Sequence, residues 1–167
     1  MLLLALATVA TSFVPTPSFT SRPSSAHFDG ANAIELSSSE QQIYDFLQEL
    51  HTSGYPFRTI VSGNGAILES TQRLGPTLKV GESGKTGDLI LTMASEDQSF
   101  EFHVKIQQVH KIVLVERELP GKTIRIIRMT NAEEQSMCSL ILGEYSDEAA
   151  SFFQGLVTKY GSEFQPK

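Results

Sequence analysis

The chain has 167 residues, and its 13 lysines and arginines against 19 aspartates and glutamates give a formal charge of −6. This charge excludes nucleic-acid binding by bulk charge, because neutralising phosphates needs a basic surface. The length suits one domain of about 100–150 residues. The only cysteine, Cys138, excludes an internal disulfide and a metal site built from cysteines. No stretch approaches the roughly 20 apolar residues of a membrane-spanning helix, so we expect no transmembrane segment.

Residues 1–34 have the composition of a targeting presequence. Residues 2–9 are apolar over the length of a signal-peptide core. The following segment is rich in Ser, Thr and Pro, with Arg22 but no acid before Asp29, as in transit peptides. Residues 10–15 resemble the junction of the bipartite presequences that algae with red-lineage plastids use. We therefore expect delivery to the plastid, to the stroma rather than the thylakoid lumen; a plain secretory signal with a linker is the alternative.

Residues 35–167 form the predicted mature domain, which begins with a helix. Ser37 with Glu40, or Ser39 with Gln42, can form a capping box, in which two side chains satisfy N–H groups at the helix start. Four apolar residues then recur at helical spacing: Ile43, Phe46, Leu47 and Leu50.

A second helix is predicted between Ser146, which can cap it, and Gly161, with Phe152 and Phe153 on its apolar face. Between the two helices the apolar pattern has the period of two that is typical of strands. It covers residues 57–62, 66–72, 89–94, 100–107, 112–118, 123–130 and 136–142. The short connections favour antiparallel neighbours. The sequence thus predicts an α+β fold: a curved antiparallel sheet or open barrel of about seven strands with an N-terminal and a C-terminal helix.

Two features that suggest enzyme chemistry have simpler explanations. Gly84, Lys85 and Thr86 match the last three residues of the phosphate-binding loop motif. However, Lys79 occupies the position at which that motif needs a glycine, and the predicted element that follows is a strand instead of a helix. We therefore expect a hairpin loop. Cys138 alternates with apolar residues in a predicted strand, which indicates a buried, unreactive thiol.

Two histidines and three arginines are the candidate binding residues. His103 lies on the polar side of its predicted strand, either as a surface histidine or as an axial ligand to a haem iron, for which imidazole is the usual protein group. His110 is the other candidate ligand. Arg117, Arg125 and Arg128 lie on adjacent predicted strands and could hold the propionates of a haem. The alternative is that they pair across strands with Glu116, Glu118 and Glu101.

The order and spacing of the elements over residues 40–160 carry a family resemblance. The matching parts are the hairpin 59–69 with its glycine turn, the strand 112–117 ending in Val-Glu-Arg, the turn at Gly121, the strand 123–129 with Asn131, and the strand 136–142 followed by Gly143, Asp147 and the last helix. In these parts the chain resembles the intracellular haem-utilisation proteins, the small haem carriers of bacterial uptake systems. It departs from them where Phe102 and His103 replace a Gly-His pair and where residues 126–128 replace bulky aromatics.

The resemblance implies an antiparallel sheet with flanking helices, haem as cofactor, and a homodimer. We expect a plastid haem- or tetrapyrrole-binding carrier, buffer or sensor that is not an enzyme, with His103 as iron ligand. Two alternatives stay open. One is a scaffold or assembly factor of the photosynthetic apparatus that kept the fold and lost the ligand, which the altered Gly-His pair favours. The other is a haem-degrading enzyme.

Overall fold

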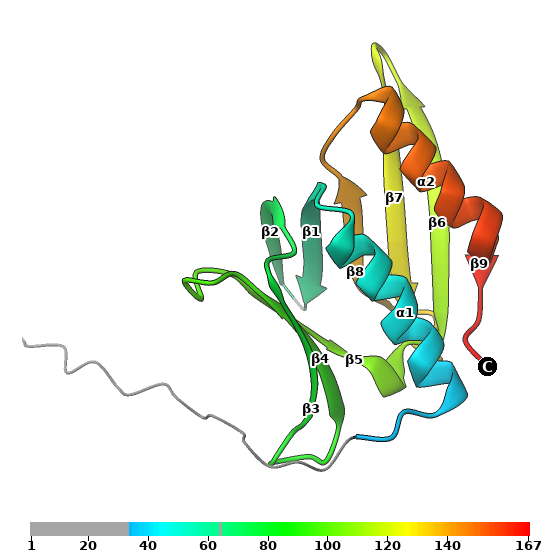
Figure 1. The fold of residues 1–167 in the computed structure, drawn as a ribbon. Coiled ribbons are helices and arrows are strands. Elements are labelled where there is room, and N and C mark those ends of the chain that lie inside the picture. Colours follow the sequence, from blue (N-terminus) through cyan, green and yellow to red (C-terminus); the bar gives the residue numbers. More distant parts are fainter. Residues whose placement is uncertain (1–33, 64) are drawn as a thin grey trace, which may run out of the picture. The chain divides into compact units, whose positions relative to one another are not determined.

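The computed structural model describes residues 34–63 and 65–167 (Figure 1). The predicted presequence lies outside the described residues except for its last position, Ile34. The elements, in chain order, are α1 (Ser38–Thr52), β1 (Pro56–Gly63), β2 (Ala66–Arg73), β3 (Thr77–Glu82), β4 (Leu89–Ala94), β5 (Glu101–Lys105), the short 3-10 helix η1 (Ile106–Gln108), β6 (Lys111–Leu119), β7 (Lys122–Thr130), β8 (Ser136–Leu142), α2 (Asp147–Tyr160) and β9 (Glu163–Phe164). The described residues therefore form an α+β fold.

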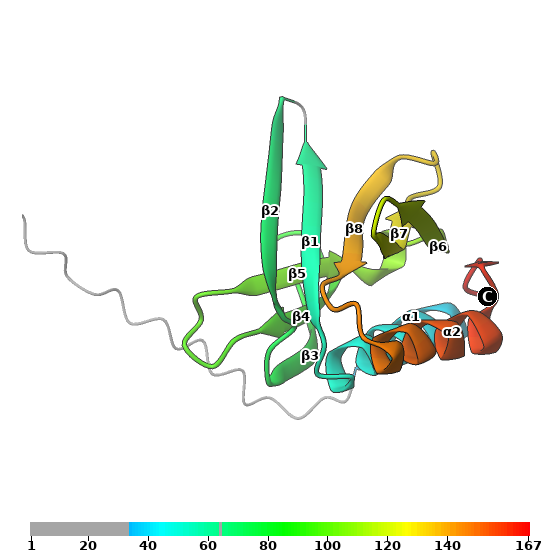
Figure 2. The same ribbon diagram turned by 90° about the horizontal axis from the view of Figure 1, so that it is seen from above.

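The larger of two sheets has six strands in the order β2-β1-β8-β7-β6-β9, with every pair of neighbours antiparallel. Figure 1 shows β6 and β7 along their length, whereas the view turned by 90° in Figure 2 shows β1 and β2 along theirs. The strand direction therefore turns strongly across the sheet, as accumulated right-handed strand twist requires. The sheet is curved, as predicted, and stays open rather than closing into a barrel.

The smaller sheet has the order β3-β4-β5. Two of the strands, β3 and β9, are not apparent from the sequence. The β3 segment has two apolar residues, Leu78 and Val80, and then Gly81, so its strand signal is short, and pairing with β4 from Thr77↔Ala94 to Glu82↔Leu89 makes it a strand. Strand β9 has two residues and exists through its pairing with β6. One strand is shorter than predicted. The sequence predicts a strand over residues 100–107, but β5 ends at Lys105 and the 3-10 helix η1 follows it.

A glycine fixes the entry into the smaller sheet. Gly75 has a φ of +80°, and a Cβ at this position would lie 2.1 Å from the carbonyl oxygen of Ala94. Any side chain would thus collide with the backbone of β4, in a conformation that favours glycine in any case. The chain can cross from β2 to β3 at this point because residue 75 has no side chain.

The capping box of α1 is formed by Ser37 and Glu40. The Ser37 hydroxyl accepts from the Glu40 N–H at 3.4 Å, and the Glu40 carboxylate accepts from the Ser37 N–H at 2.7 Å. Ser146 caps α2 by accepting from the Ala149 N–H at 3.2 Å. The predicted helix starts are therefore confirmed.

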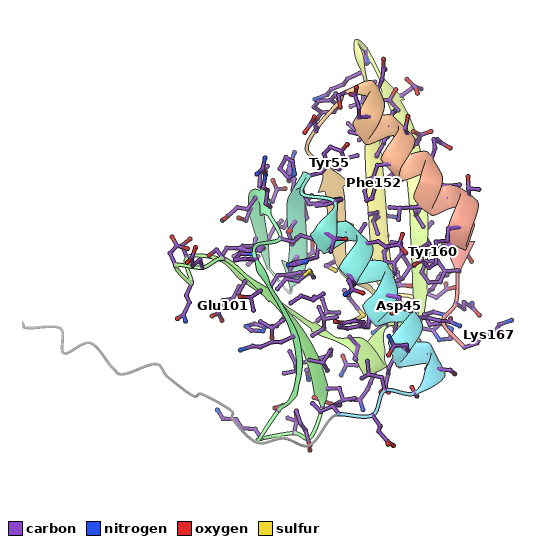
Figure 3. All side chains as sticks on the ribbon, in the orientation of Figure 1. Asp45, Tyr55, Glu101, Phe152, Tyr160 and Lys167 are labelled. Atoms are coloured by element: carbon purple, nitrogen blue, oxygen red, sulfur yellow. The ribbon has the colours of Figure 1, made fainter. Side chains whose placement is uncertain are left out.

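Figures 1 and 2 show α1 and α2 on the same side of the large sheet. The core lies there, and its largest fully buried side chains include Phe46, Ile127 and Phe153. Phe152, which the sequence placed on the same apolar face, is only partly buried and packs against Tyr55 with ring centroids 5.4 Å apart (Figure 3). No helix of the described residues covers the opposite side of the large sheet (Figure 2).

Candidate functional site

A cavity of about 330 Å³ lies between the smaller sheet and the hairpin end of the large one. Its apolar lining comes from both sheets and includes Val61 on β1, Val104 on β5, and Met137 and Cys138 on β8. Its polar lining consists of Ser62, His103, Lys105, Gln108 and Ser136. We call it the His103 cavity. Apolar walls with a few polar groups are the usual lining of a small-molecule site.

His103 is in the lining of this cavity, but the alternation of β5 turns its side chain to the other face of the strand, where His103, Thr92 and Glu101 line a separate cavity of about 240 Å³. Glu101, His103 and Lys105 point away from the core, whereas Phe102 and Val104 are buried. The His103 side chain is 50% exposed. Its Nδ1 lies 2.9 Å from the Thr92 hydroxyl, and its Nε2 lies 3.1 Å from a Glu101 carboxylate oxygen. Both ring nitrogens are therefore engaged, one of them with an exposed partner.

The neighbouring charges on β5 are also paired. Glu101 lies on the smaller sheet, away from the helices (Figure 3). Lys105 lies 2.8 Å from Asp88. Hydrogen bonds from Lys105 first and Thr86 second lower the pKa of Asp88. The lysine in the lining of the His103 cavity is thus already paired with a carboxylate.

A second cavity, of about 470 Å³, adjoins the first, and Ser62 and Ser136 line both. Its other lining residues include two cations, Arg128 on β7 and Lys111 on β6. Among the described residues, no carboxylate lies within 4.0 Å of Arg128, whereas Lys111 is 3.4 Å from Glu134. We call this space the Arg128 cavity. It can accept an anionic group beside the apolar walls of the His103 cavity.

The hydroxyl of Thr130, which also lines the Arg128 cavity, has no hydrogen-bond partner among the described residues. Thr130 is 7% exposed, and its Oγ1 is buried. Buried polar atoms are nearly always hydrogen-bonded, so an ordered water or a ligand oxygen is expected to complete this one. Lys111 and Thr130 were not recognised as candidates from the sequence, although their place at strand ends beside Arg128 follows from the β6–β7 pairing.

The three predicted arginines do not form one cluster. Arg125 is directly opposite Glu116 and its Nε donates to that carboxylate at 2.8 Å, on the helix-covered face. The same carboxylate accepts from Gln154 of α2 at 2.7 Å. Arg117 and Arg128 lie on the other face, opposite Ile124 and Val113 respectively. Four strand positions separate them, which is roughly 13 Å. Of the three arginines, Arg128 is beside the His103 cavity, and Arg125 has the cross-strand pairing that was the alternative expectation.

The remaining histidines lie elsewhere. His110 is exposed just before β6, lines neither cavity, and donates its backbone N–H to Thr130 at 2.8 Å. His51 is in the last turn of α1, and its ring nitrogens are buried without partners among the described residues. In residues 34–63 and 65–167 no three His, Cys, Asp or Glu side chains come together as a metal-binding group.

Two sequence predictions about unreactive features are confirmed. Gly84, Lys85 and Thr86 form part of the hairpin loop between β3 and β4, where the Ser83 N–H donates to Asp88 at 2.8 Å. Cys138 is 5% exposed, and burial raises the pKa of its thiol to about 12. The thiol is therefore protonated at neutral pH, as expected of an unreactive cysteine.

No family model and no curated protein matches the chain, but solved structures do. The haem-binding protein ChuX has a TM-score of 0.57 and 18% identity over 72% of this chain and 73% of ChuX. Holo-PhuS, a haem-binding protein from Pseudomonas aeruginosa, has a TM-score of 0.55 and 12% identity over 69% of this chain and 32% of PhuS. ChuS, a haem-degrading enzyme of Escherichia coli O157:H7, has a TM-score of 0.55 and 11% identity over 72% of this chain and 34% of ChuS.

These similarities show that the chain has the fold of the haem-utilisation proteins. The chain spans about a third of PhuS and of ChuS and nearly three quarters of ChuX. The neighbours include haem-binding proteins and a haem-degrading enzyme, so the fold alone does not separate binding from degradation. None of the helices in the described part of the chain is long and apolar enough to cross a membrane.

Proposed function

We propose that the protein binds haem or a related tetrapyrrole and acts as a carrier, buffer or sensor rather than as an enzyme. The observation that carries the proposal is the adjacency of two cavities, one with apolar walls and His103 in its lining and one lined by Arg128 and Lys111 together with Glu134, in a fold shared with haem-binding proteins. A haem has the matching chemistry: an apolar ring, an iron that accepts an axial imidazole, and two anionic propionates. The ring would occupy the His103 cavity.

In this proposal His103 holds the iron through Nε2, while Thr92 orients the ring through Nδ1. Binding then requires Nε2 to leave Glu101, and the bond between them is weak because both side chains are close to half exposed. Arg128 and Lys111 would hold a propionate by charge-assisted hydrogen bonds, with the unsatisfied Thr130 hydroxyl nearby. Arg125 keeps its partner Glu116 and takes no part.

The experiment is a titration of haemin into the full chain, followed by absorbance. We expect saturable binding at micromolar protein with a shifted Soret band. Absence of saturable binding would instead support the second candidate, a scaffold or assembly factor that kept the fold without the ligand. The observation that favours this candidate is that both nitrogens of His103 already have partners.

Haem degradation is the third candidate, because one neighbour of this fold is a haem-degrading enzyme. Haemin-loaded protein should be mixed with ascorbate under air. A carrier keeps its Soret band apart from the slow bleaching that a matched haemin–albumin sample also shows. Faster loss of the band than in albumin would contradict the proposal that the protein is not an enzyme.

We further propose a location in the plastid stroma, supported by the composition of residues 1–34. A fluorescent fusion of these residues, expressed in a red-lineage alga, should enter the plastid. Secretion to the medium would contradict this location. A fusion with Phe13→Asp should be diverted, because Phe13 belongs to the junction that resembles plastid presequences.

A homodimer is also part of the proposal. Its support is the edge strand β2, which has no neighbouring strand on its outer side among residues 34–63 and 65–167 and in which Ile67 is 69% exposed and Leu68 64% exposed. Exposed apolar edge strands readily pair with another chain.

A further inference from the structure

The face of the large sheet turned away from the helices has an unusual charge. Residues directly opposite each other on neighbouring strands lie on the same face, and one row across this face runs through Thr71, Arg58, Ile141, Ile126 and Val115. Since every second residue of a strand points the same way, this row assigns the remaining residues of the face. We call this surface the open face.

Most charges on the open face are positive. Its strand positions carry six cations, Arg58, Arg73, Lys111, Arg117, Lys122 and Arg128, and two acids, Glu69 on β2 and Glu163 on β9. Glu69 pairs with Arg58 at 2.6 Å, whereas Glu134 of the β7–β8 turn and Glu163 lie 3.4 Å and 4.0 Å from Lys111. Within the described residues, Arg73, Arg117, Lys122 and Arg128 have no carboxylate within 4.0 Å. The face is therefore cationic on a protein whose formal charge is −6.

Between these cations the open face is apolar. Isoleucines and valines occupy its middle: Ile60, Val113, Val115, Ile124, Ile126 and Ile141. Most are half-buried by their neighbours, and Val115 is 39% exposed. An apolar centre within a charged rim is the usual composition of a protein–protein interface.

The open face also has a hollow at each end. One is the Arg128 cavity, and the other, of about 250 Å³, is lined by residues that include Arg58, Lys122, Ile124 and Tyr145. The Lys122 ammonium lies 5.3 Å from the centroid of the Tyr145 ring. Each hollow thus combines a cation with space for a side chain, which fits carboxylates presented by a partner.

We propose that the open face binds an acidic protein partner, one that presents carboxylates around apolar side chains. Charge complementarity of this kind steers association and selects the partner. A second copy fits poorly on this face, because two cationic faces would then meet. The described strands place no aromatic side chain on the open face, and Tyr145, which lines one of its hollows, already has the Lys122 ammonium over its ring; a row of rings on which successive bases could stack is therefore missing from these strands, which disfavours RNA. An anionic membrane would repel the acidic remainder of the protein.

The test uses the full chain and a synthetic decapeptide of alternating Glu and Val, with a Lys–Val peptide as its counterpart. Binding is measured by fluorescence anisotropy at low and at physiological salt. We expect saturable binding of the Glu–Val peptide alone, weakened by salt. The double variant Arg117→Glu with Lys122→Glu should bind roughly tenfold or more weakly.

The matched control is Lys79→Glu with Lys85→Glu, which makes the same charge change on β3 and on the loop after it. We expect it to bind within twofold of the wild type. The proposal is overturned if the wild type shows no saturable binding, or if the two double variants bind equally well. Tighter binding of phosphatidylglycerol vesicles or of oligouridine than of the peptide would also overturn it.

Two further measurements keep this test separate from folding and from haem. Thermal melts of both double variants show whether they fold, and amide hydrogen exchange of the wild type should slow on β7 and β8 when the peptide binds. If exchange stays unchanged there, the peptide binds elsewhere and the proposal is wrong. Arg117 and Lys122 line neither the His103 cavity nor the Arg128 cavity, so haemin binding should be equal in all variants.

Discussion

The Nδ1 of His103 lies 2.9 Å from the hydroxyl of Thr92, its direct neighbour on β4. This contact fixes the ring plane and directs Nε2 toward solvent and Glu101, which lies 3.1 Å away. A histidine whose second nitrogen is held by a neighbour is already oriented for an iron ligand. A surface histidine with no ligand can make the same contact with Thr92. Variants of His103 therefore distinguish an iron ligand from a surface histidine.

We expect His103→Ala to remove or shift the Soret signature of bound haemin while leaving the melting temperature nearly unchanged, because the side chain is half exposed. Glu101→Ala should tighten haemin binding by about 0.2–1 kcal/mol, the usual strength of an exposed ion pair, because Nε2 no longer has to leave a partner. His110→Ala is the control. If His103→Ala keeps the spectrum and His110→Ala loses it, the ligand is His110 and the haem proposal stands.

Arg128 and Arg125 form a matched pair of variants on one strand. Arg128→Gln should weaken haemin binding by about 1.5–3 kcal/mol without changing the iron spectrum, because it removes a charge-assisted hydrogen bond to a propionate. Arg125→Gln should instead lower the free energy of unfolding, because Arg125 is 12% exposed and pairs with Glu116. Haemin dimethyl ester supplies the check, since it should bind wild type and Arg128→Gln equally well.

The helix that covers the large sheet should depend on Phe153 more than on Phe152. Phe153 is 1% exposed, so Phe153→Ala should lower the free energy of unfolding by about 3–5 kcal/mol. Phe152→Ala should have a smaller effect, because Phe152 is only partly buried. Urea unfolding followed by circular dichroism measures both. Equal losses in the two variants would show that α2 packs differently.

The turn between β4 and β5 should respond to acid through Asp97. Hydrogen bonds from the Ser95 hydroxyl, then from the backbone and hydroxyl of Ser99, lower the pKa of Asp97 to about 2. Because this pKa is lowered in the folded state, the stabilisation is present above the ordinary aspartate value of 3.8 and is lost as the pH falls through 3.8 toward about 2. Asp97→Asn should therefore show a smaller loss of melting temperature between pH 5 and pH 2 than the wild type. Parallel pH profiles would contradict this role.

The proposed dimer can be tested at the edge of β2. Ile67→Lys with Leu68→Lys should convert a dimer into a monomer, because charged side chains block pairing at a sheet edge. Light scattering during size exclusion gives the mass of each species. Val115→Lys, which changes an exposed apolar residue on the open face, should leave the dimer intact. A monomeric wild type, or a double variant that remains dimeric, would contradict this interface.

The elements whose signals are local follow from the sequence alone. Capping residues and apolar spacing define both helices, and the glycine turn predicts the hairpin of β1 and β2, whose residues pair from Pro56↔Arg73 to Gly63↔Ala66. Alternation within a strand also predicts the burial of Cys138. The same alternation also predicts that Arg125 and Arg128 face opposite sides of the sheet, because they are three residues apart on one strand. The expectation of a single arginine cluster did not take this into account.

The meeting of distant strands, in contrast, depends on the tertiary structure. β3 becomes a strand because β4 supplies its hydrogen bonds, and its own apolar alternation is limited to Leu78 and Val80, which is too short a signal to predict a strand. The pairing of β8 with both β1 and β7 places Ser62 beside Arg128 in one cavity, although 66 positions in the sequence separate them. Local patterns record which side a residue faces, whereas a site built by several strands depends on their order and register, which packing of the whole domain selects.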